Sequence, residues 1–201
     1  MRSIILASAS PRRGELLQQM GVEFRVWPAD IDETPGDHEQ PGDYVLRLAR
    51  EKALAIARLA PEAIVVGADT SVVIDTCILG KPATCEEAAD TLRALSGRTH
   101  QVLTGVAVAV DGYAVACLVT TDVRFRTLRP DEIGSYVRSG EPMDKAGSYG
   151  IQGLGGIFVE SLRGSYSAVV GLPLRETADL LAQAGYPVWT TWLTGQESLN
   201  E

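Results

Sequence analysis

Two long runs of β-forming residues in the middle of the chain restrict its fold more than any other feature. They cover residues 101–110 and 113–125, and only the dipeptide Asp111-Gly112 separates them. Because Asp-Gly is a strong signal for a two-residue hairpin turn, the two runs are expected to pair antiparallel. A purely parallel sheet would need helical crossovers, which are missing here. The sequence therefore predicts a mixed sheet that contains long antiparallel strands.

The remaining segments predict an α/β fold in which helices flank this sheet. Apolar runs indicate the strands, and apolar residues at three- and four-residue spacing indicate the helices. Strands are expected at residues 4–7, 24–27 and 64–74, followed by a short return strand after Asp75-Thr76. Helices are expected at residues 11–21, 43–60, 84–97, 130–140 and 174–184, and residues 157–162 and 166–170 are expected to form a second hairpin. We expect one domain over residues 1–201, with no role assigned to the tail from about residue 187.

Composition and charge argue against several functional classes. The chain is 45% hydrophobic and 22% charged, as in ordinary soluble globular proteins, and it has no apolar run long enough to span a bilayer. Its formal net charge of −8 argues against nonspecific binding to nucleic acid or to anionic membranes. The three cysteines have no spacing that would indicate a disulfide framework or a zinc site. We therefore expect a cytoplasmic protein in which a local cluster of cations holds any anionic ligand.

The hexapeptide Ser8-Ala9-Ser10-Pro11-Arg12-Arg13 indicates such a cluster at the junction of the first strand and the first helix. Ser10 suits the N-cap position, where its hydroxyl can accept from a free N–H, and Pro11 suits the first helical position. Both arginines then fall in the first turn, although the helix N-terminus already carries partial positive charge. Free N–H groups, serine hydroxyls and two guanidinium groups together describe a phosphate site. A capped surface helix with solvated arginines explains this stretch alone equally well.

Asp69 is the strongest single candidate for a catalytic residue. It interrupts the apolar strand at residues 64–74, where a carboxylate is costly unless it is paired, hydrogen-bonded or bound to a metal. Lys52 falls on the apolar face of the helix at residues 43–60. Its ammonium group either reaches the protein surface, which is the commoner case, or points into a cleft. The acidic loop at residues 28–41 is expected to be mostly solvated, but one of its carboxylates could ligate Mg²⁺ beside substrate phosphates.

Several other polar residues are interpreted as structural. His100 is expected to make a local hydrogen bond at a strand end, and neither it nor His38 is placed in the site. Cys77 and Cys117 lie within apolar strands, so we expect them to be small core residues and not nucleophiles. Residues 141–153 are rich in glycine, which lets the backbone approach a ligand closely.

Five short motifs along the chain form a distinctive combination. They are SASPRR, GADT at residues 67–70, GKP at residues 80–82, LSGRTHQVLTGV at residues 95–106 and DKAGSYGIQG at residues 144–153. Together they resemble the Maf family of nucleoside triphosphate pyrophosphatases, and the resemblance covers residues 3 to about 181. It implies a Maf/ITPase-like α/β fold of two lobes with a cleft between them. It also implies hydrolysis of a nucleoside triphosphate to the monophosphate and pyrophosphate, with Mg²⁺ or Mn²⁺ as the cofactor.

The resemblance also implies roles for individual residues. Asp69 matches the family's catalytic carboxylate, which acts as a general base or as the ligand of a metal-bound water. Glu33 matches the acidic loop position that would help Asp69 to hold the metal. The residues that match the family's positive cradle for the substrate, with Lys145 added from the last motif, are Ser8, Arg12, Arg13, Lys52, Lys81 and Lys145.

The form of the DKAGSYGIQG motif resembles the branch of the family that acts on dTTP and UTP. Arg12, Thr70 and Gln152 match the residues that select the base in that branch. The amide of Gln152 offers one acceptor and two donors, which complement the N3–H and a carbonyl of uracil or thymine. A loop-stabilising amide is the alternative interpretation of Gln152.

The leading functional hypothesis is an enzyme that removes dTTP, UTP or modified pyrimidine triphosphates from the nucleotide pool. A homodimer is expected by family analogy. Two alternatives remain at this point: a non-catalytic nucleotide-binding regulator of cell division, and a phosphatase that releases single phosphates.

Overall fold

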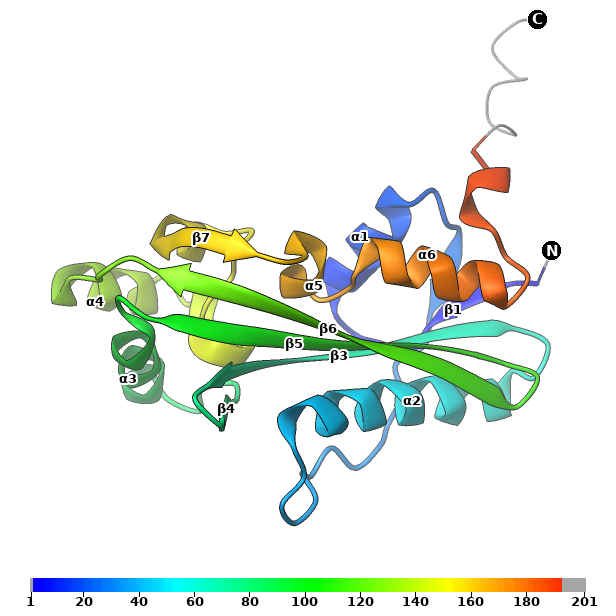
Figure 1. The fold of residues 1–201 in the computed structure, drawn as a ribbon, viewed down its shortest axis with the longest axis horizontal. Coiled ribbons are helices and arrows are strands. Elements are labelled where there is room, and N and C mark those ends of the chain that lie inside the picture. The colour runs from blue at the N-terminus through cyan, green and yellow to red at the C-terminus, as the bar shows by residue number, and fades with distance from the viewer. Residues whose placement is uncertain (1, 193–201) are drawn as a thin grey trace, which may run out of the picture.

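The computed structural model of the chain describes residues 2–192 and contains one seven-stranded mixed sheet (Figure 1). The strands are β1 (Ile4–Leu6), β2 (Phe24–Val26), β3 (Ile64–Ile74), β4 (Cys77–Leu79), β5 (Thr99–Val110), β6 (Tyr113–Phe125) and β7 (Val159–Arg163). They follow the order β2-β1-β3-β5-β6-β7, and β4 pairs with the end of β3. β1 is parallel to β2 and β3, whereas β5 is antiparallel to β3 and β6, and β7 is antiparallel to β6. The predicted mixed sheet is confirmed.

The predicted hairpin of β5 and β6 is also confirmed. The two strands pair along their whole length, from Thr99 opposite Arg124 to Val110 opposite Tyr113. Asp111 and Gly112 form the turn with φ angles of 52° and 80°. Positive φ at both central residues is the turn geometry that matches the twist of the flanking strands. Because β3 pairs with the other edge of β5, three long strands form the centre of the molecule.

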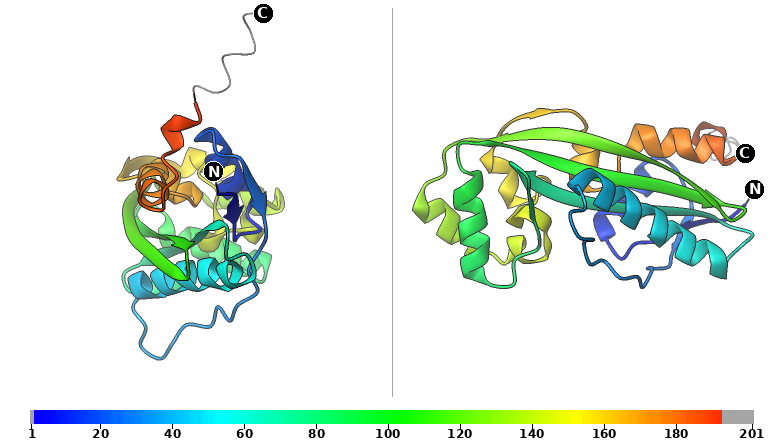
Figure 2. Two further views of the ribbon diagram at one scale, coloured as in Figure 1. Left: turned by 90° about the vertical axis from the view of Figure 1, so that its right-hand side faces the viewer. Right: turned by 60° about the horizontal axis from the view of Figure 1, so that its bottom comes forward.

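Helices cover both faces of the sheet (Figures 1 and 2). They are α1 (Pro11–Gln19), α2 (Pro41–Leu59), α3 (Cys85–Leu95), α4 (Pro130–Arg138), α5 (Tyr166–Val170) and α6 (Leu174–Gln183), with single-turn 3₁₀ helices at residues 141–144, 146–148, 154–158 and 188–190. α2 packs on one face through Ala49 and Ala53, and α1 and α6 pack on the other face through Leu17 and Leu181. Within residues 2–192, no helix combines the length and the apolar character needed to cross a membrane.

Of the apolar cores in the described residues, two lie toward opposite ends of the long strands and define two lobes. Ile64 and Val66, in the first part of β3, pack in the core that contains residues of α1 and α6. Val72 and Ile74, near the end of the same strand, pack with residues of α3 and α4. Figure 2 accordingly shows α3 and α4 at one end of an elongated molecule and α1, α2 and α6 at the other. The same three strands therefore continue from one lobe into the next.

Two glycines bring α2 into direct contact with the sheet. A Cβ atom at Gly67 in β3 would lie 2.4 Å from the Ala49 carbonyl oxygen, and a Cβ atom at Gly105 in β5 would lie 2.4 Å from the Val45 carbonyl oxygen. Neither position has room for a side chain, because both atoms belong to the backbone of α2. The helix consequently lies close enough for its buried side chains to reach polar groups on β3.

The structure contradicts the second predicted hairpin. Residues 166–170 form the helix α5, and β7 pairs with β6 instead. Ser165 caps this helix because its hydroxyl accepts a hydrogen bond from the Ala168 N–H, and Gly171 ends it with a φ of 133°. A five-residue apolar run fits a strand and a short buried helix equally well, and here the serine cap decides between them.

The two cysteines that were predicted to lie in the core differ in exposure, and the start of the tail contacts the first helix. Cys77 is exposed, so its assignment to the core is wrong, whereas Cys117 in β6 is half-buried. The exposure of Cys77 follows from its place directly after the Asp75-Thr76 turn, in a short strand that pairs with β3. In the tail, the Trp192 indole donates a hydrogen bond to the Met20 carbonyl oxygen at 2.8 Å. The tail residues from 193 onward lie outside the described part of the chain.

His100 makes a hydrogen bond, but the prediction of a local partner is wrong, because the partner lies 49 positions away in the sequence. Its Nε2 atom lies 2.8 Å from the Tyr149 hydroxyl, and its ring packs edge-on against Phe125 and Tyr149. Only 2% of His100 is exposed. Burial lowers the pKa of His100 to about 4, because desolvation disfavours the charged imidazolium. His100 is therefore neutral at pH 7 and stabilises the lobe that contains α3 and α4.

The lowered pKa of His100 predicts a loss of stability in mild acid. The unfolded chain binds a proton below about pH 6.5, whereas folded His100 binds one only near pH 4, so the free energy of unfolding should fall between these values. The expected loss is about 3 kcal/mol. Urea denaturation at several pH values should show a weaker pH dependence in His100→Gln than in the parent. Equal slopes in His100→Gln and the parent would contradict the prediction.

Candidate active site

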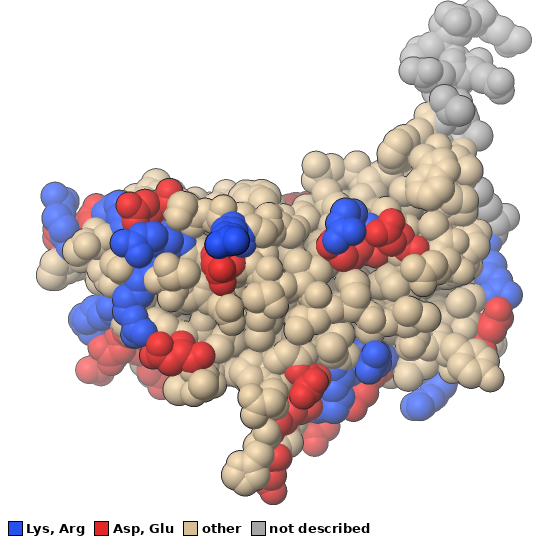
Figure 3. Space-filling model, viewed as in Figure 1, with Lys and Arg blue, Asp and Glu red and all other residues tan. Residues whose placement is uncertain are grey.

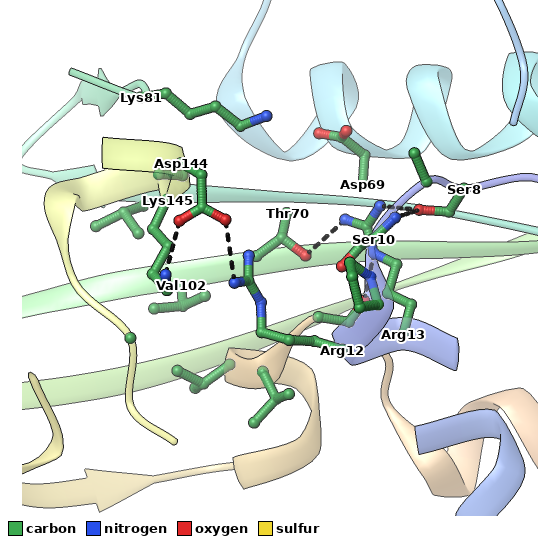
Figure 4. A pocket seen from close by; sticks show the side chains of 18 of the residues that line it. Ser8, Ser10, Arg12, Arg13, Asp69, Thr70, Lys81, Val102, Asp144 and Lys145 are labelled. Atoms are coloured by element: carbon green, nitrogen blue, oxygen red, sulfur yellow. Dashed lines mark hydrogen bonds and ion pairs between the residues drawn. The ribbon is translucent and has the colours of Figure 1, made fainter. Parts of the chain in front are cut away.

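A pocket of about 420 Å³ lies between the two lobes (Figure 4). It is lined by the turn between β1 and α1, the middle of β3, the segment after β4, the glycine-rich segment at residues 144–153 and the end of α5. All the site residues predicted from the sequence line it, namely Ser8, Arg12, Arg13, Glu33, Lys52, Asp69, Thr70, Lys81, Lys145 and Gln152. The structure thus brings together residues that are up to 144 positions apart, from Ser8 to Gln152.

The hexapeptide after β1 forms the start of α1 as predicted, but its serines act differently. Pro11 occupies the first helical position, and Ser10 adopts an extended N-cap conformation. Within the described residues, the Ser10 hydroxyl caps no helical N–H. Instead, the Ser8 hydroxyl accepts hydrogen bonds from the Ser10 N–H at 3.2 Å and from the Arg13 guanidinium at 3.0 Å. Ser8 therefore provides the side-chain acceptor in this turn, and the first N–H groups of the helix, which have no intrahelical partner, are available to a ligand.

Arg13 is held rigidly at the back of the pocket. Its guanidinium donates to the Gly171 carbonyl oxygen at 2.9 Å and to the Thr70 hydroxyl at 3.3 Å, in addition to Ser8. Desolvation lowers the pKa of Arg13, and attraction to the nearby Asp69 carboxylate opposes that shift. An arginine remains protonated nevertheless. Arg13 therefore presents a fixed positive charge that joins α1, β3 and the end of α5.

Arg12 lies across the mouth of the pocket from a carboxylate that the sequence analysis did not select. Its guanidinium is 3.5 Å from the Asp144 carboxylate, which also accepts a hydrogen bond from Lys145 at 2.7 Å (Figure 4). The hydrogen bond from Lys145 lowers the pKa of Asp144, and Arg12 adds to the effect. Asp144 was present in the DKAG motif, but nothing local indicated a partner in α1. In this structure its carboxylate occupies the space between two cations that are suited to a phosphate.

Asp69, Lys52 and Glu33 form an ion-paired triad in the pocket. The Lys52 ammonium lies 2.8 Å from an Asp69 carboxylate oxygen and 2.7 Å from a Glu33 carboxylate oxygen. Lys52 is only 7% exposed, so the alternative in which its ammonium reaches the protein surface is wrong. The close packing of α2 on Gly67 makes this contact possible, because Lys52 lies one helical turn after Ala49 and Asp69 lies two residues after Gly67. Lys52 neutralises and orients the carboxylate of Asp69.

The donor set of this triad is compatible with a divalent cation. Within residues 2–192, no group of three or more His, Cys, Asp or Glu side chains could hold a metal ion by itself. The carboxylates of Glu33 and Asp69 nevertheless converge on one cationic centre, the Lys52 ammonium. Mg²⁺ commonly takes one or two protein carboxylates and completes its shell with substrate phosphates and water. The two carboxylates therefore fit a metal that is shared with a bound phosphate group.

The side chains of Lys81 and Gln152 differ from the other site residues in their lack of polar partners within the described residues. Neither side chain makes a hydrogen bond or an ion pair with another residue in the described part of the chain. Figure 4 shows Lys81 extending toward Asp69 from the side opposite Ser8. Gln152 is exposed within the glycine-rich segment. Both groups are therefore available to a ligand, one as a point charge and the other as a hydrogen-bonding amide.

Residues 3–184 match the family model described as Maf-like protein. The chain belongs to the Maf family. A Maf relative from Escherichia coli, called dTTP/UTP pyrophosphatase, is 55% identical over 183 residues, which are 90% of this chain and 93% of that protein. A protein of the same name from Colwellia psychrerythraea is 54% identical over 190 residues, covering 92% of this chain and 90% of the relative. A third, from Shigella flexneri, is called nucleoside triphosphate pyrophosphatase and is 55% identical over 183 residues, with coverages of 90% and 93%.

The Maf fold also has a structural counterpart of low sequence identity. The structure titled "Structure of a HAM1 protein from Coxiella burnetii" aligns with 91% of this chain and 100% of its own length, at a TM-score of 0.51 and 18% identity. This similarity bears on the fold alone. It confirms the expected arrangement of a central sheet flanked by helices.

Proposed function

We propose that this Maf-family protein hydrolyses nucleoside triphosphates to the monophosphate and pyrophosphate, with dTTP and UTP as preferred substrates. The observation that carries the proposal is the convergence of the Asp69 carboxylate with two arginines and three lysines on one pocket. Glu33 and Asp144 also line the pocket, so five cations face three carboxylates there. The remaining positive charge suits a triphosphate, whose hydrolysis requires both neutralisation and an oriented water. The names of the relatives support the same reaction and the same bases.

In the proposed mechanism, the cations bind the triphosphate and Asp69 directs the attack of water on the α-phosphorus. Arg13 and Lys52 are already fixed by hydrogen bonds, so they lose little freedom when the substrate binds. Lys81 adds a point charge from the segment after β4, whose Leu79 packs against the core of the lobe that contains α3 and α4. Asp69 accepts the proton of the attacking water or would help to hold a divalent cation, and the ion pair with Lys52 orients its carboxylate for either role.

We assign Glu33 and Asp69 as the residues that would hold Mg²⁺ or Mn²⁺. When bound, such an ion would supply charge neutralisation on the triphosphate and a more acidic water. Glu33 reaches the site because α2 fixes its loop: the Tyr44 hydroxyl donates to the Glu33 carbonyl oxygen at 2.9 Å. Arg47, one turn further along α2, donates to the Thr34 carbonyl oxygen at 3.1 Å.

The proposed base preference rests on Arg12, Thr70 and Gln152. The amide of Gln152 can accept from N3–H and donate to a carbonyl of uracil or thymine, whereas cytosine presents an unprotonated N3 and an amino group. The hydroxyl of Thr70 lies 3.1 Å from that of Thr104 and accepts from Arg13. Thr70 therefore contributes by fixing Arg13 more than by contacting the base. Arg12 would exchange its contact with Asp144 for a substrate oxygen.

We further propose that the protein acts in the cytoplasm as a homodimer that clears nucleotide pools, on family analogy. Figure 3 shows Lys and Arg interspersed with Asp and Glu over one face of the molecule, without a continuous basic surface there. That mixed surface, with the net charge of −8, supports a small-molecule triphosphate as the ligand and not a nucleic acid.

A panel of triphosphates tests the proposed function. With Mg²⁺ or Mn²⁺ present, the protein should release pyrophosphate, and dTTP and UTP should be hydrolysed at least about tenfold faster than dCTP or the purine triphosphates. Separate assays for pyrophosphate and orthophosphate distinguish the products. Tight binding without turnover would favour a regulator, orthophosphate release would favour a phosphatase, and either result would overturn the proposal.

A further inference from the structure

We infer that Glu141 is a positioning residue that holds the loop carrying Gln152 against the pocket and thereby sets the discrimination between uracil or thymine and cytosine. This inference rests on the proposed function. Glu141 does not line the pocket itself, so it would act on the base through the loop and not by direct contact.

Three hydrogen bonds converge on the Glu141 carboxylate. One oxygen accepts from the Leu154 N–H at 2.8 Å, and the other accepts from the Gly155 N–H at 3.0 Å and from the Tyr136 hydroxyl at 2.9 Å. Both N–H groups belong to the backbone just after Gln152. A single side chain, from the first residue of the 3₁₀ helix at residues 141–144, thus fixes two successive amides of the loop.

Tyr136 fixes the loop backbone on the N-terminal side of Gln152. Its hydroxyl donates to Glu141 and accepts from the Gly150 N–H at 3.1 Å. The loop is therefore anchored at residue 150 and again at residues 154 and 155. Ile151 and Gln152 lie between the two anchors, and both line the pocket. The Gln152 side chain makes no hydrogen bond of its own with residues 2–192, so its place depends on these backbone hydrogen bonds.

Glycines in the loop leave room for the Glu141 and Tyr136 side chains to approach its backbone. A Cβ atom at Gly153 would lie 2.4 Å from a Glu141 carboxylate oxygen, and a Cβ atom at Gly155 would lie 2.7 Å from the Tyr136 hydroxyl oxygen. Side chains at these positions would expel the carboxylate or the phenol. The glycine-rich composition of residues 141–153 thus serves contact with Glu141 as well as contact with a ligand.

The ionised state suits Glu141 to this role. Burial opposes ionisation, but the N–H groups of Gly155 and Leu154 and the Tyr136 hydroxyl outweigh burial, so the pKa of Glu141 lies below its usual value. A carboxylate accepts at both oxygens, whereas an amide replaces one acceptor with a donor. Glu141→Gln therefore keeps the volume of the side chain and must lose at least one of the three hydrogen bonds.

The test compares Glu141→Gln with Glu160→Gln, an exposed glutamate on β7 that pairs with Arg124. The selectivity of the parent protein for dTTP over dCTP is measured first. A parent protein without this selectivity would contradict the proposed function. Where the parent prefers dTTP, Glu141→Gln should raise KM for dTTP and lower the dTTP to dCTP ratio of kcat/KM about tenfold. Tyr136→Phe should shift the ratio in the same direction, and Glu160→Gln should leave it unchanged.

Hydrogen exchange provides a readout that does not depend on catalysis. The amides of Gly150, Leu154 and Gly155 should exchange faster in Glu141→Gln than in the parent and in Glu160→Gln, because their acceptors are weakened. Faster exchange with a reduced nucleotide ratio supports the inference. An unchanged ratio overturns it, even if activity toward all nucleotides falls together. Unchanged exchange at these amides overturns it as well.

Discussion

Asp69→Asn is expected to lower kcat for dTTP by about 100- to 10,000-fold. An asparagine amide neither accepts a proton at neutral pH nor binds a divalent cation as a carboxylate does. The amide oxygen can still accept a hydrogen bond from Lys52, which lies 2.8 Å from the Asp69 carboxylate in the parent. The fold should therefore survive. Pyrophosphate release, thermal melting and dTTP affinity measured on the same preparation separate a loss of chemistry from a loss of structure.

Asp75→Asn is the matched control for this substitution. Asp75 lies six residues further along the chain, in the turn after β3, with a φ of 56° that asparagine readily adopts. Its carboxylate pairs with Arg98 and is exposed. Turnover should match the parent in Asp75→Asn. Parental turnover in Asp69→Asn would remove Asp69 from the proposed chemistry.

Gly67→Ala is expected to destabilise the protein by about 1–3 kcal/mol and to reduce activity as well. The added methyl group would meet the Ala49 carbonyl oxygen at 2.4 Å and the Ala53 nitrogen at 2.8 Å. Both contacts are backbone atoms, so α2 must move away from β3 as a unit. That movement displaces Lys52 from Asp69, and a displacement of about 1 Å near reacting groups can cost roughly 100-fold in rate. Urea denaturation and dTTP hydrolysis measure the two effects.

Gly80→Ala provides the comparison for stability. Among residues 2–192, no atom outside Gly80 and its two chain neighbours lies within 4 Å of a Cβ at Gly80. The same chemical change should therefore alter the free energy of unfolding by less than about 0.5 kcal/mol. Equal denaturation midpoints for Gly67→Ala and Gly80→Ala would contradict the close packing of α2 on the sheet.

Much of this architecture follows from short-range patterns in the sequence. The Asp111-Gly112 turn specifies the long hairpin because both residues adopt positive φ. Asp69 stood out because an isolated carboxylate in an apolar strand requires a partner. Lys52 was likewise a charged residue in apolar surroundings, on the apolar face of a helix. For Asp69 this conflict between residue type and surroundings predicted a site residue, whereas for Lys52 it left two alternatives open, and the structure places both residues in the pocket.

Other features depend on contacts that no local pattern contains. The pairing of Lys52 with Asp69 requires α2 to approach β3, which depends on glycines that could equally have marked turns or bulges. Asp144 and Glu141 gain their roles only when the loop after α4 folds back on itself and against α1. Helix α5 was missed because its five residues are too few to show a period, and the Ser165 cap that defines it is a single residue.

The central claim is that Asp69 and the surrounding cations promote attack of water on the α-phosphorus of a pyrimidine triphosphate. Hydrolysis of dTTP in water enriched with oxygen-18, followed by mass spectrometry of both products, tests this claim most directly. Attack at the α-phosphorus places the heavy oxygen in dTMP and leaves the pyrophosphate unlabelled. Heavy oxygen in the pyrophosphate, or release of orthophosphate in its place, would contradict the account.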